Sequence, residues 1–188
     1  ERRLAERVRA LLDAAPEPVD TATLGPQGGL FAYDWTPAGA TNWQAVAAFT
    51  AQRHRFAVIS GGPGTGKTYT IVRLMIRLVE AARAAGERPP VIRLAAPTGK
   101  AATRLQQAVV EQAPALATAP EVRGWLAQAS ASTLHRLLGG QPGRRSRFRH
   151  HHGNRLPHDA VIVDETSMVS LSLMARLVEA VRPAARLV

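Results

Sequence analysis

The fold is decided by residues 60–68, which read Ser60-Gly61-Gly62-Pro63-Gly64-Thr65-Gly66-Lys67-Thr68. An apolar segment over residues 56–59 precedes this stretch, and a run with apolar residues at helical spacing follows it. We therefore expect a buried strand over residues 55–60 and a helix over residues 67–85. A glycine- and proline-containing turn that happens to precede a helix is the alternative. However, residues 61–68 fit the full G-x-x-x-x-G-K-T pattern of a phosphate-binding loop, in the strand–loop–helix context that it requires.

Each residue type in this loop has a physical role at a phosphate site. Glycine lets the backbone approach phosphate oxygens closely, and the loop amides then form an anion-binding nest at a helix N-terminus. Lys67 would contact the β- and γ-phosphates, and the Thr68 hydroxyl would bind Mg²⁺. The predicted nucleotide-binding residues of the loop are Gly61, Gly62, Pro63, Gly64, Thr65, Gly66, Lys67 and Thr68.

Two carboxylates, Asp164 and Glu165, follow the apolar segment Val161-Ile162-Val163. In open α/β sheets, ligands bind at the carboxyl ends of the strands. Asp164 is suited to hold Mg²⁺ through water, and Glu165 is suited to orient or deprotonate the attacking water. Taken alone, the pair could be an acidic turn that caps the next helix. Together with the loop it predicts an ATPase site, with the carboxylates and Lys67 converging from neighbouring strand ends.

Strands and helices alternate in the first segments, which favours an α/β fold with a parallel sheet flanked by helices. We expect strands over 91–96 and 160–163, and an apolar run begins again at residue 185. Further helices are expected over 1–15, 42–52, 122–128 and 132–138, after the turn at 97–100, and between Glu165 and Pro183. Asn42 and Ser132 are the expected N-caps. The buried face of the helix over 42–52 is expected to consist of Trp43, Val46, Ala47 and Phe49. Residues 16–41 look like an irregular lead-in that could contain one hairpin.

The composition narrows the function classes. The formal charge is +10, from 24 Lys+Arg against 14 Asp+Glu, which favours a polyanionic partner such as nucleic acid, although general arginine richness is the alternative. The sequence has no cysteine, so disulfides and cysteine-ligated metal centres are excluded. No apolar run approaches the ~18 residues of a membrane span. We expect a cytoplasmic protein without membrane association.

Five blocks, in this order, resemble the first motor domain of superfamily 1 helicases, and most closely the RecD-type alpha subunit of bacterial exodeoxyribonuclease V. The blocks are Asn42-Trp43-Gln44, residues 61–68, residues 95–102 (Ala-Ala-Pro-Thr-Gly-Lys-Ala-Ala), residues 132–138 (Ser-Thr-Leu-His-Arg-Leu-Leu) and residues 163–168 (Val-Asp-Glu-Thr-Ser-Met). The resemblance implies a P-loop NTPase (RecA-like) domain over 42–188, truncated before its last strands, behind a lead-in over 1–41.

The resemblance also implies residue roles and partners. Gln44 would read the adenine ring, which makes ATP the preferred nucleotide. The implied cofactors are ATP and Mg²⁺. Lys67 and Glu165 would be catalytic, and Thr68 and Asp164 would hold the metal. The implied DNA-binding residues are Thr98, Lys100, Thr133 and His135. The whole protein would be an ATP-dependent 5′-to-3′ DNA helicase of double-strand break repair and recombination, working on single-stranded and duplex DNA with partner helicase and nuclease subunits. The 188-residue chain alone should bind ATP weakly, hydrolyse it poorly and not unwind DNA.

Several alternatives stay open. The chain could be a phosphate-loop ATPase of another kind, or a docking domain with a silent site. Thr98 could be an ordinary N-cap, and His135 a packed or surface histidine. The basic run Arg144, Arg145, Arg147 and Arg149 could follow a phosphate backbone or be a solvated loop. The histidines at 150–152 and 158 do not favour a metal site, because consecutive side chains point apart. Thr166 and Tyr69 depart from the family pattern without removing a catalytic group.

Overall fold

The core of the molecule is a parallel β-sheet with the strand order β2-β1-β5-β6. The computed structural model describes residues 2–19, 41–62, 64–115, 119–141 and 144–188, without the side chains of 141 and 144–147. The strands are β1 (Ile92–Ala96), β2 (Ala131–Thr133), β5 (Ala160–Val163) and β6 (Arg186–Leu187). Ile92 pairs with Ala160 and Leu94 with Ala131. The prediction of an α/β fold with a parallel sheet is therefore confirmed.

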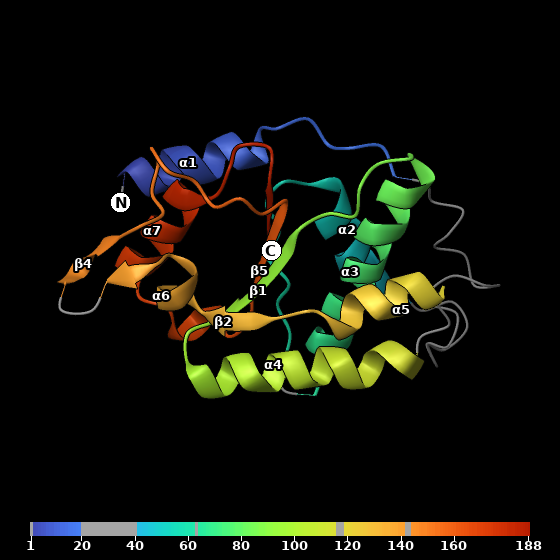
Figure 1. The fold of residues 1–188 in the computed structure, drawn as a ribbon. Helices are drawn as coiled ribbons and strands as arrows, with labels where there is room; N and C mark the ends of the chain where they lie inside the picture. The colour runs from blue at the N-terminus through green and yellow to red at the C-terminus, as the bar shows by residue number, and fades with distance from the viewer. Residues whose placement is uncertain (1, 20–40, 63, 116–118, 142–143) are drawn as a thin grey trace.

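Helices cover both faces of this sheet (Figure 1). Leu94 and Ile162 point into one core, with helices α2 (Trp43–Arg53), α3 (Lys67–Ala84), α4 (Gly99–Gln112) and α5 (Pro120–Ala127). Ala95, Val161 and Val163 point into the other core, with α1 (Arg2–Leu12), α6 (Leu134–Leu137) and α7 (Leu171–Ala180). Because both faces are buried, β5 is a continuous apolar run and does not alternate with polar residues.

Short elements complete the chain. The 3₁₀ turns η2 (Ala113–Ala115) and η3 (Thr166–Met168) follow α4 and Glu165. The polar and basic excursion before β5 contains an antiparallel hairpin of β3 (Gly140–Gln141) and β4 (Arg144–Phe148). No helix in the described parts of the chain is long and apolar enough to span a bilayer.

Polar side chains start several of the helices. Asn42 Oδ1 accepts a hydrogen bond from the Ala45 N–H at 2.9 Å, as expected for the N-cap of α2. The expected cap Ser132 is wrong: Ser132 is buried in β2, and the next residue, Thr133, caps α6. Here a three-residue strand is followed directly by a four-residue helix. Sequence patterns this short do not locate the boundary between strand and helix to within one residue.

Two expected elements differ from the structure. The strand expected over 55–60 is reduced to one parallel bridge between Phe56 and Leu187. The buried side expected for α2 is also wrong, because Trp43 is 74% and Val46 42% exposed, and Ala48 and Ala51 are packed in their place. Small residues face α3 because these two helices lie close together, which leaves the larger side chains outside.

The N-terminal helix α1 packs against the sheet domain. Leu11 of α1 is buried in the same cluster as Leu177 and Val178 of α7. Residues 20–40 of the lead-in, where its possible hairpin was expected, lie outside the described residues. The division of the chain at residues 41 and 42 stays a prediction.

A charged network lies at the edge of the sheet where the strands begin. Asp159 accepts hydrogen bonds from Arg88 at 2.9 Å, Arg182 at 2.7 Å and the Val91 N–H at 2.8 Å. Burial alone would raise the pKa of Asp159, but these three donors outweigh it and lower the pKa. The neighbouring His158 has a pKa of about 4, lowered by burial and then by Arg93, His150 and Arg182, against the opposing charge of Asp159.

We expect the protein to lose stability as the pH falls from about 6.5 to about 4. The pKa of His158 drops from 6.5 to about 4 on folding, so in this window the unfolded chain binds a proton that the folded chain does not. With allowance for the partial exposure of the side chain, His158 should account for about 1–2 kcal/mol of this loss. Urea unfolding at pH 7 and pH ~4.5 measures it.

His158→Gln should remove this part of the pH dependence, whereas His152→Gln, at an exposed histidine nearby, should leave it unchanged. Equal acid sensitivity of the wild type and His158→Gln would contradict the assignment.

Candidate nucleotide and nucleic-acid site

The sequence-predicted site residues lie at one edge of the sheet. The Phe56 segment runs parallel to β6, β6 to β5, β5 to β1, and β1 to β2. Because all five segments run in the same direction, the loops that follow them leave from the same edge. The phosphate loop follows the first segment, Asp164 and Glu165 follow β5, and the two predicted DNA-binding blocks follow β1 and β2.

The expected neighbourhood of the loop and the carboxylates needs one correction. Phe56 pairs with Leu187 of β6, and β6 in turn pairs with β5. The strand end that carries Asp164 is therefore not adjacent to the segment that carries the loop, since β6 lies between them. From the sequence, the loop segment and β5 were expected to be neighbours in the sheet. The strand that separates them, β6, has only two residues, and a pattern this short does not reveal its place in the sheet order.

The phosphate loop is closed by its own side chains. Lys67 Nζ donates hydrogen bonds to the carbonyls of Gly61 and Gly62, both at 2.7 Å. Thr65 Oγ1 donates to the Gly62 carbonyl at 2.9 Å, and Gln44 Nε2 reaches from α2 to the Thr65 carbonyl at 2.9 Å. All four hydrogen bonds are accepted by backbone carbonyl oxygens of the loop. They do not use the backbone N–H groups of the loop, which are the groups that would bind an anion. Pro63 lies outside the described residues.

The start of α3 has the features of an anion site. Its N-cap, Gly66, has φ +79° and makes no side-chain capping bond. The first intrahelical bond runs from the Thr70 N–H to the Gly66 carbonyl at 2.9 Å. The N–H groups of Lys67, Thr68 and Tyr69 therefore stand at the open end of an 18-residue helix, where the helix dipole favours negative charge.

The two carboxylates after β5 differ in their backbone. Asp164 is bound to β1 through its N–H, which donates to the Ala95 carbonyl at 2.9 Å. Its Oδ1 accepts from the Glu165 N–H at 2.8 Å. Glu165 is exposed and has φ 53° and ψ 41°, the left-handed region, which no other non-glycine residue adopts in the described parts of the chain. Such strain is typical of functional positions.

The predicted DNA-binding residues surround the starts of two helices. Thr98 Oγ1 accepts from the Ala101 N–H at 3.2 Å, and Thr133 Oγ1 from the Arg136 N–H at 3.2 Å. Ala96 is in register with Thr133, so both threonines leave neighbouring strands. Lys100 and His135 are exposed. The two hydroxyls act as N-caps, as the alternative for Thr98 proposed, and their contact with DNA stays a prediction.

The His135 ring contacts the β3–β4 hairpin, which also carries most of the basic run. The ring of His135 lies 6.0 Å from the Phe148 ring, at the end of the β3–β4 hairpin. Arg144 to Arg147 belong to β4, but their side chains are not described, and Arg149 is exposed. In the described parts of the chain, no histidine, aspartate or glutamate side chains gather in a group of three that could hold a metal.

A family model described as an AAA domain matches residues 43–188. The chain belongs to the AAA domain family. The match includes the phosphate loop, both carboxylates and the two threonine caps. Within this AAA domain, the blocks that carry the site are separated along the chain and united only by the parallel sheet.

Curated proteins of two kinds are similar to this chain. The RecBCD enzyme subunit RecD of Mycolicibacterium smegmatis is 57% identical over 145 residues, which are 77% of this chain and 26% of that protein. The same subunit of Mycobacterium tuberculosis H37Rv is 54% identical over 145 residues, 77% of this chain and 24% of that protein. The ATP-dependent RecD2 DNA helicase of Deinococcus radiodurans is 37% identical over 191 residues, 99% of this chain and 21% of that protein.

These relatives confirm the resemblance to RecD-type helicases. The chain spans about a quarter of the length of the curated relatives that it matches.

Some contacts at the site carry no local sequence signal. Gln44 and Thr65 are 21 positions apart, so the hydrogen bond that joins them could not be derived from residue spacing. The cation–π contact of Arg73 with the Tyr69 ring, at 4.0 Å, was visible only as an i, i+4 pair on α3. The departure of Tyr69 from the family pattern therefore has a packing role in this chain.

Gly66→Ala should weaken nucleotide binding by roughly tenfold or more, because a Cβ at residue 66 overlaps Gln44 Nε2 and the φ of +79° is strained for alanine. Gly86→Ala is a matched control: its φ of +70° carries the same strain, but nothing lies within 4 Å of the added carbon. Both variants should lose about 1 kcal/mol of unfolding free energy. Titration with a fluorescent ATP analogue separates them, and equal affinities would contradict the role of residue 66.

Glu165→Asn should raise the unfolding free energy by about 0.5–1 kcal/mol, because asparagine tolerates the left-handed conformation better than glutamate. Glu165→Gln removes the same charge but keeps the strain, so its stability should match the wild type. Urea unfolding of the two variants measures the difference. Identical unfolding free energies for Asn and Gln at this position would show that no strain is stored there.

Proposed function

We propose that the chain is the ATP-binding motor domain of a RecD-type DNA helicase, with Gln44, the phosphate loop, Asp164 and Glu165 forming the ATPase site. The observation that carries this proposal is the common edge: parallel pairing brings the loop and both carboxylates to the carboxyl ends of one sheet. The whole protein would couple ATP hydrolysis to 5′-to-3′ movement on DNA, in a complex with helicase and nuclease subunits in the cytoplasm.

The residues at the loop fit a nucleotide. The open end of α3 offers three N–H groups to phosphate oxygens, and Lys67 adds a positive charge that can exchange its two carbonyl acceptors for the β- and γ-phosphates. Gln44 stands against the loop and would bind the adenine edge through its amide. Because an amide both donates and accepts, it favours adenine over a base with other donors and acceptors on that edge.

The donor set also fits Mg²⁺, which prefers hard oxygen ligands. Thr68 at the first turn of α3 would bind the ion directly, and Asp164 would hold it through water. Bound there, the ion would neutralise charge on the phosphates. Glu165, exposed beside Asp164, would orient a water molecule and accept its proton.

DNA would cross the other half of the same edge. Thr98 and Lys100 follow β1, the strand next to β5. Thr133 is the last residue of β2, at the border of the sheet, and His135 follows it. The backbone bond between Asp164 and Ala95 joins the ATP half to the DNA half at 2.9 Å. A shift of Asp164 on hydrolysis would therefore be felt at the end of β1, two residues before Thr98.

A phosphate-loop ATPase of another kind is the second candidate, and a silent docking domain the third. The exposed Lys100 beyond the Thr98 cap favours a nucleic-acid motor, and the presence of Lys67, Asp164 and Glu165 argues against silence. Stimulation of ATPase activity by single-stranded DNA distinguishes the three. That residues 1–188 alone do not unwind DNA also stays a prediction.

Lysine substitutions give a sharp test, since the sequence contains only two lysines, Lys67 and Lys100. In the intact protein, Lys67→Ala should weaken ATP binding and abolish turnover, a loss of at least ~10²-fold, because it removes the ammonium that the loop itself offers to the phosphates. Lys100→Ala should keep ATP affinity and basal turnover but lose DNA stimulation, with a weaker salt dependence of DNA binding.

Steady-state ATPase rates with and without single-stranded DNA measure both effects, and the two variants control for each other because each removes one lysine charge. Full ATP turnover by Lys67→Ala would contradict the assignment of the loop as the ATPase site. DNA stimulation that survives Lys100→Ala would remove that residue from the DNA path.

A further inference from the structure

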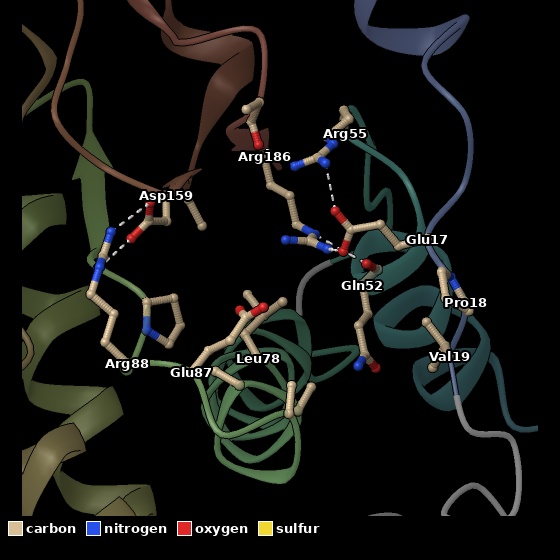
Figure 2. Close-up of a pocket in the computed structure, with 16 residues that line it drawn as sticks. Glu17, Pro18, Val19, Gln52, Arg55, Leu78, Glu87, Arg88, Asp159 and Arg186 are labelled. Carbon is tan, nitrogen blue, oxygen red and sulfur yellow. Dashed lines mark hydrogen bonds and ion pairs between the residues drawn. The ribbon is translucent and has the colours of Figure 1, made fainter.

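A charged pocket of about 520 Å³ lies at the edge of the sheet opposite to the phosphate loop (Figure 2). Its walls come from the starts of β5 and β6, the C-terminal part of α3 and the segment at residues 17–19. That segment precedes the region that the AAA domain model matches. Figure 2 shows Glu17 reaching from it toward Arg55 and Arg186.

Glu17 makes three contacts with this edge. Its Oε1 accepts from Arg55 Nη2 at 2.7 Å, and its Oε2 accepts from Arg186 Nη2. Its N–H donates to the Arg53 carbonyl at 2.8 Å. The side chains of Arg55 and Arg186 are only 25% and 14% exposed, so water screens the two ion pairs less than it screens a surface pair.

The two arginines belong to the two segments whose pairing carries the loop. Arg55 directly precedes Phe56, and its carbonyl accepts from the Leu187 N–H at 2.8 Å. Arg186 directly precedes Leu187, whose carbonyl accepts from the Ala57 N–H at 3.1 Å. Arg55 Nη1 also donates to the Ala184 carbonyl. Glu17 therefore joins the residues that directly precede the two partners of the bridge between the loop segment and β6.

We propose that Glu17 is a positioning residue for the phosphate loop, which clamps the segment before the loop onto β6. This inference rests on the proposed function, because it assigns Glu17 to the same ATP site from the far edge of the sheet. Without the carboxylate, two guanidinium groups would face each other across the bridge and repel. A slip of one residue along a strand moves the following loop by ~3.3 Å, enough to displace Lys67 from a bound phosphate.

The test is Glu17→Gln in the intact protein, with Glu6→Gln as a matched control. Glu6 lies in α1, is paired only with Arg2 across one helical turn among its described contacts, and gives the same change of net charge. Glu17→Gln should weaken binding of a fluorescent ATP analogue with Mg²⁺ roughly tenfold, at a temperature where both variants are folded, and Glu6→Gln should change it less than about twofold. Hydrogen exchange should quicken at Ala57 and Leu187 but not in α4.

A charge exchange separates positioning from a merely structural role. Glu17→Arg combined with Arg55→Glu keeps one carboxylate and two guanidinium groups at this place, and the ATP affinity should return to within about twofold of the wild type. An unchanged affinity in Glu17→Gln, or a lost affinity that the exchange does not restore, would overturn the proposal. If the wild type itself bound no ATP, the proposed function would fail, while hydrogen exchange at Ala57 would still report on the clamp.

Discussion

Two backbone hydrogen bonds of Leu187 determine where the phosphate loop lies. They join its N–H to the Arg55 carbonyl and its carbonyl to the Ala57 N–H, at 2.8 and 3.1 Å. Their parallel pattern directs the chain after Phe56 toward the edge where β5 ends. With antiparallel pairing the same loop would leave at the opposite edge, away from Asp164. The chemistry of the site therefore depends on a contact between residues that are about 130 positions apart.

Local pattern was sufficient where burial is continuous along the chain. The helix after the loop and the strand before Asp164 lie within a residue or two of their predicted bounds, since every residue there contributes to one periodic signal. Trp43 and the strand at 55–60 were predicted wrongly, because their burial depends on what packs against them. The sequence shows that Trp43 is apolar but not how much space its helix has on the buried side. Where α2 packs against α3, only small residues such as Ala48 and Ala51 fit.

The candidate site divides in the same way. The loop, Asp164 and Glu165 are recognisable from motifs whose residues are contiguous. Three other features are not recognisable from the sequence, because each depends on a tertiary contact or on a backbone angle. They are the hydrogen bond from Gln44 to Thr65, the left-handed backbone of Glu165 and the pairing of Glu17 with two arginines. Thr98 and Thr133 are intermediate: the spacing predicts a cap for Thr98, but each hydroxyl can cap a helix with a lone pair and still donate its O–H to a phosphate.

The two edges of the sheet are built for opposite purposes. The functional edge holds Glu165, the one non-glycine residue with left-handed backbone in the described parts of the chain, and such backbone costs ~1–2 kcal/mol. The opposite edge concentrates ion pairs: Asp159 joins the segments before β1 and β5 to the end of α7, and Glu17 joins the N-terminal segment to β6 and the loop segment. Strain at the reacting end persists only if the strands that carry it cannot relax by sliding. Charge pairs at the strand starts oppose that sliding, and they do so without occupying the edge at which ligands bind.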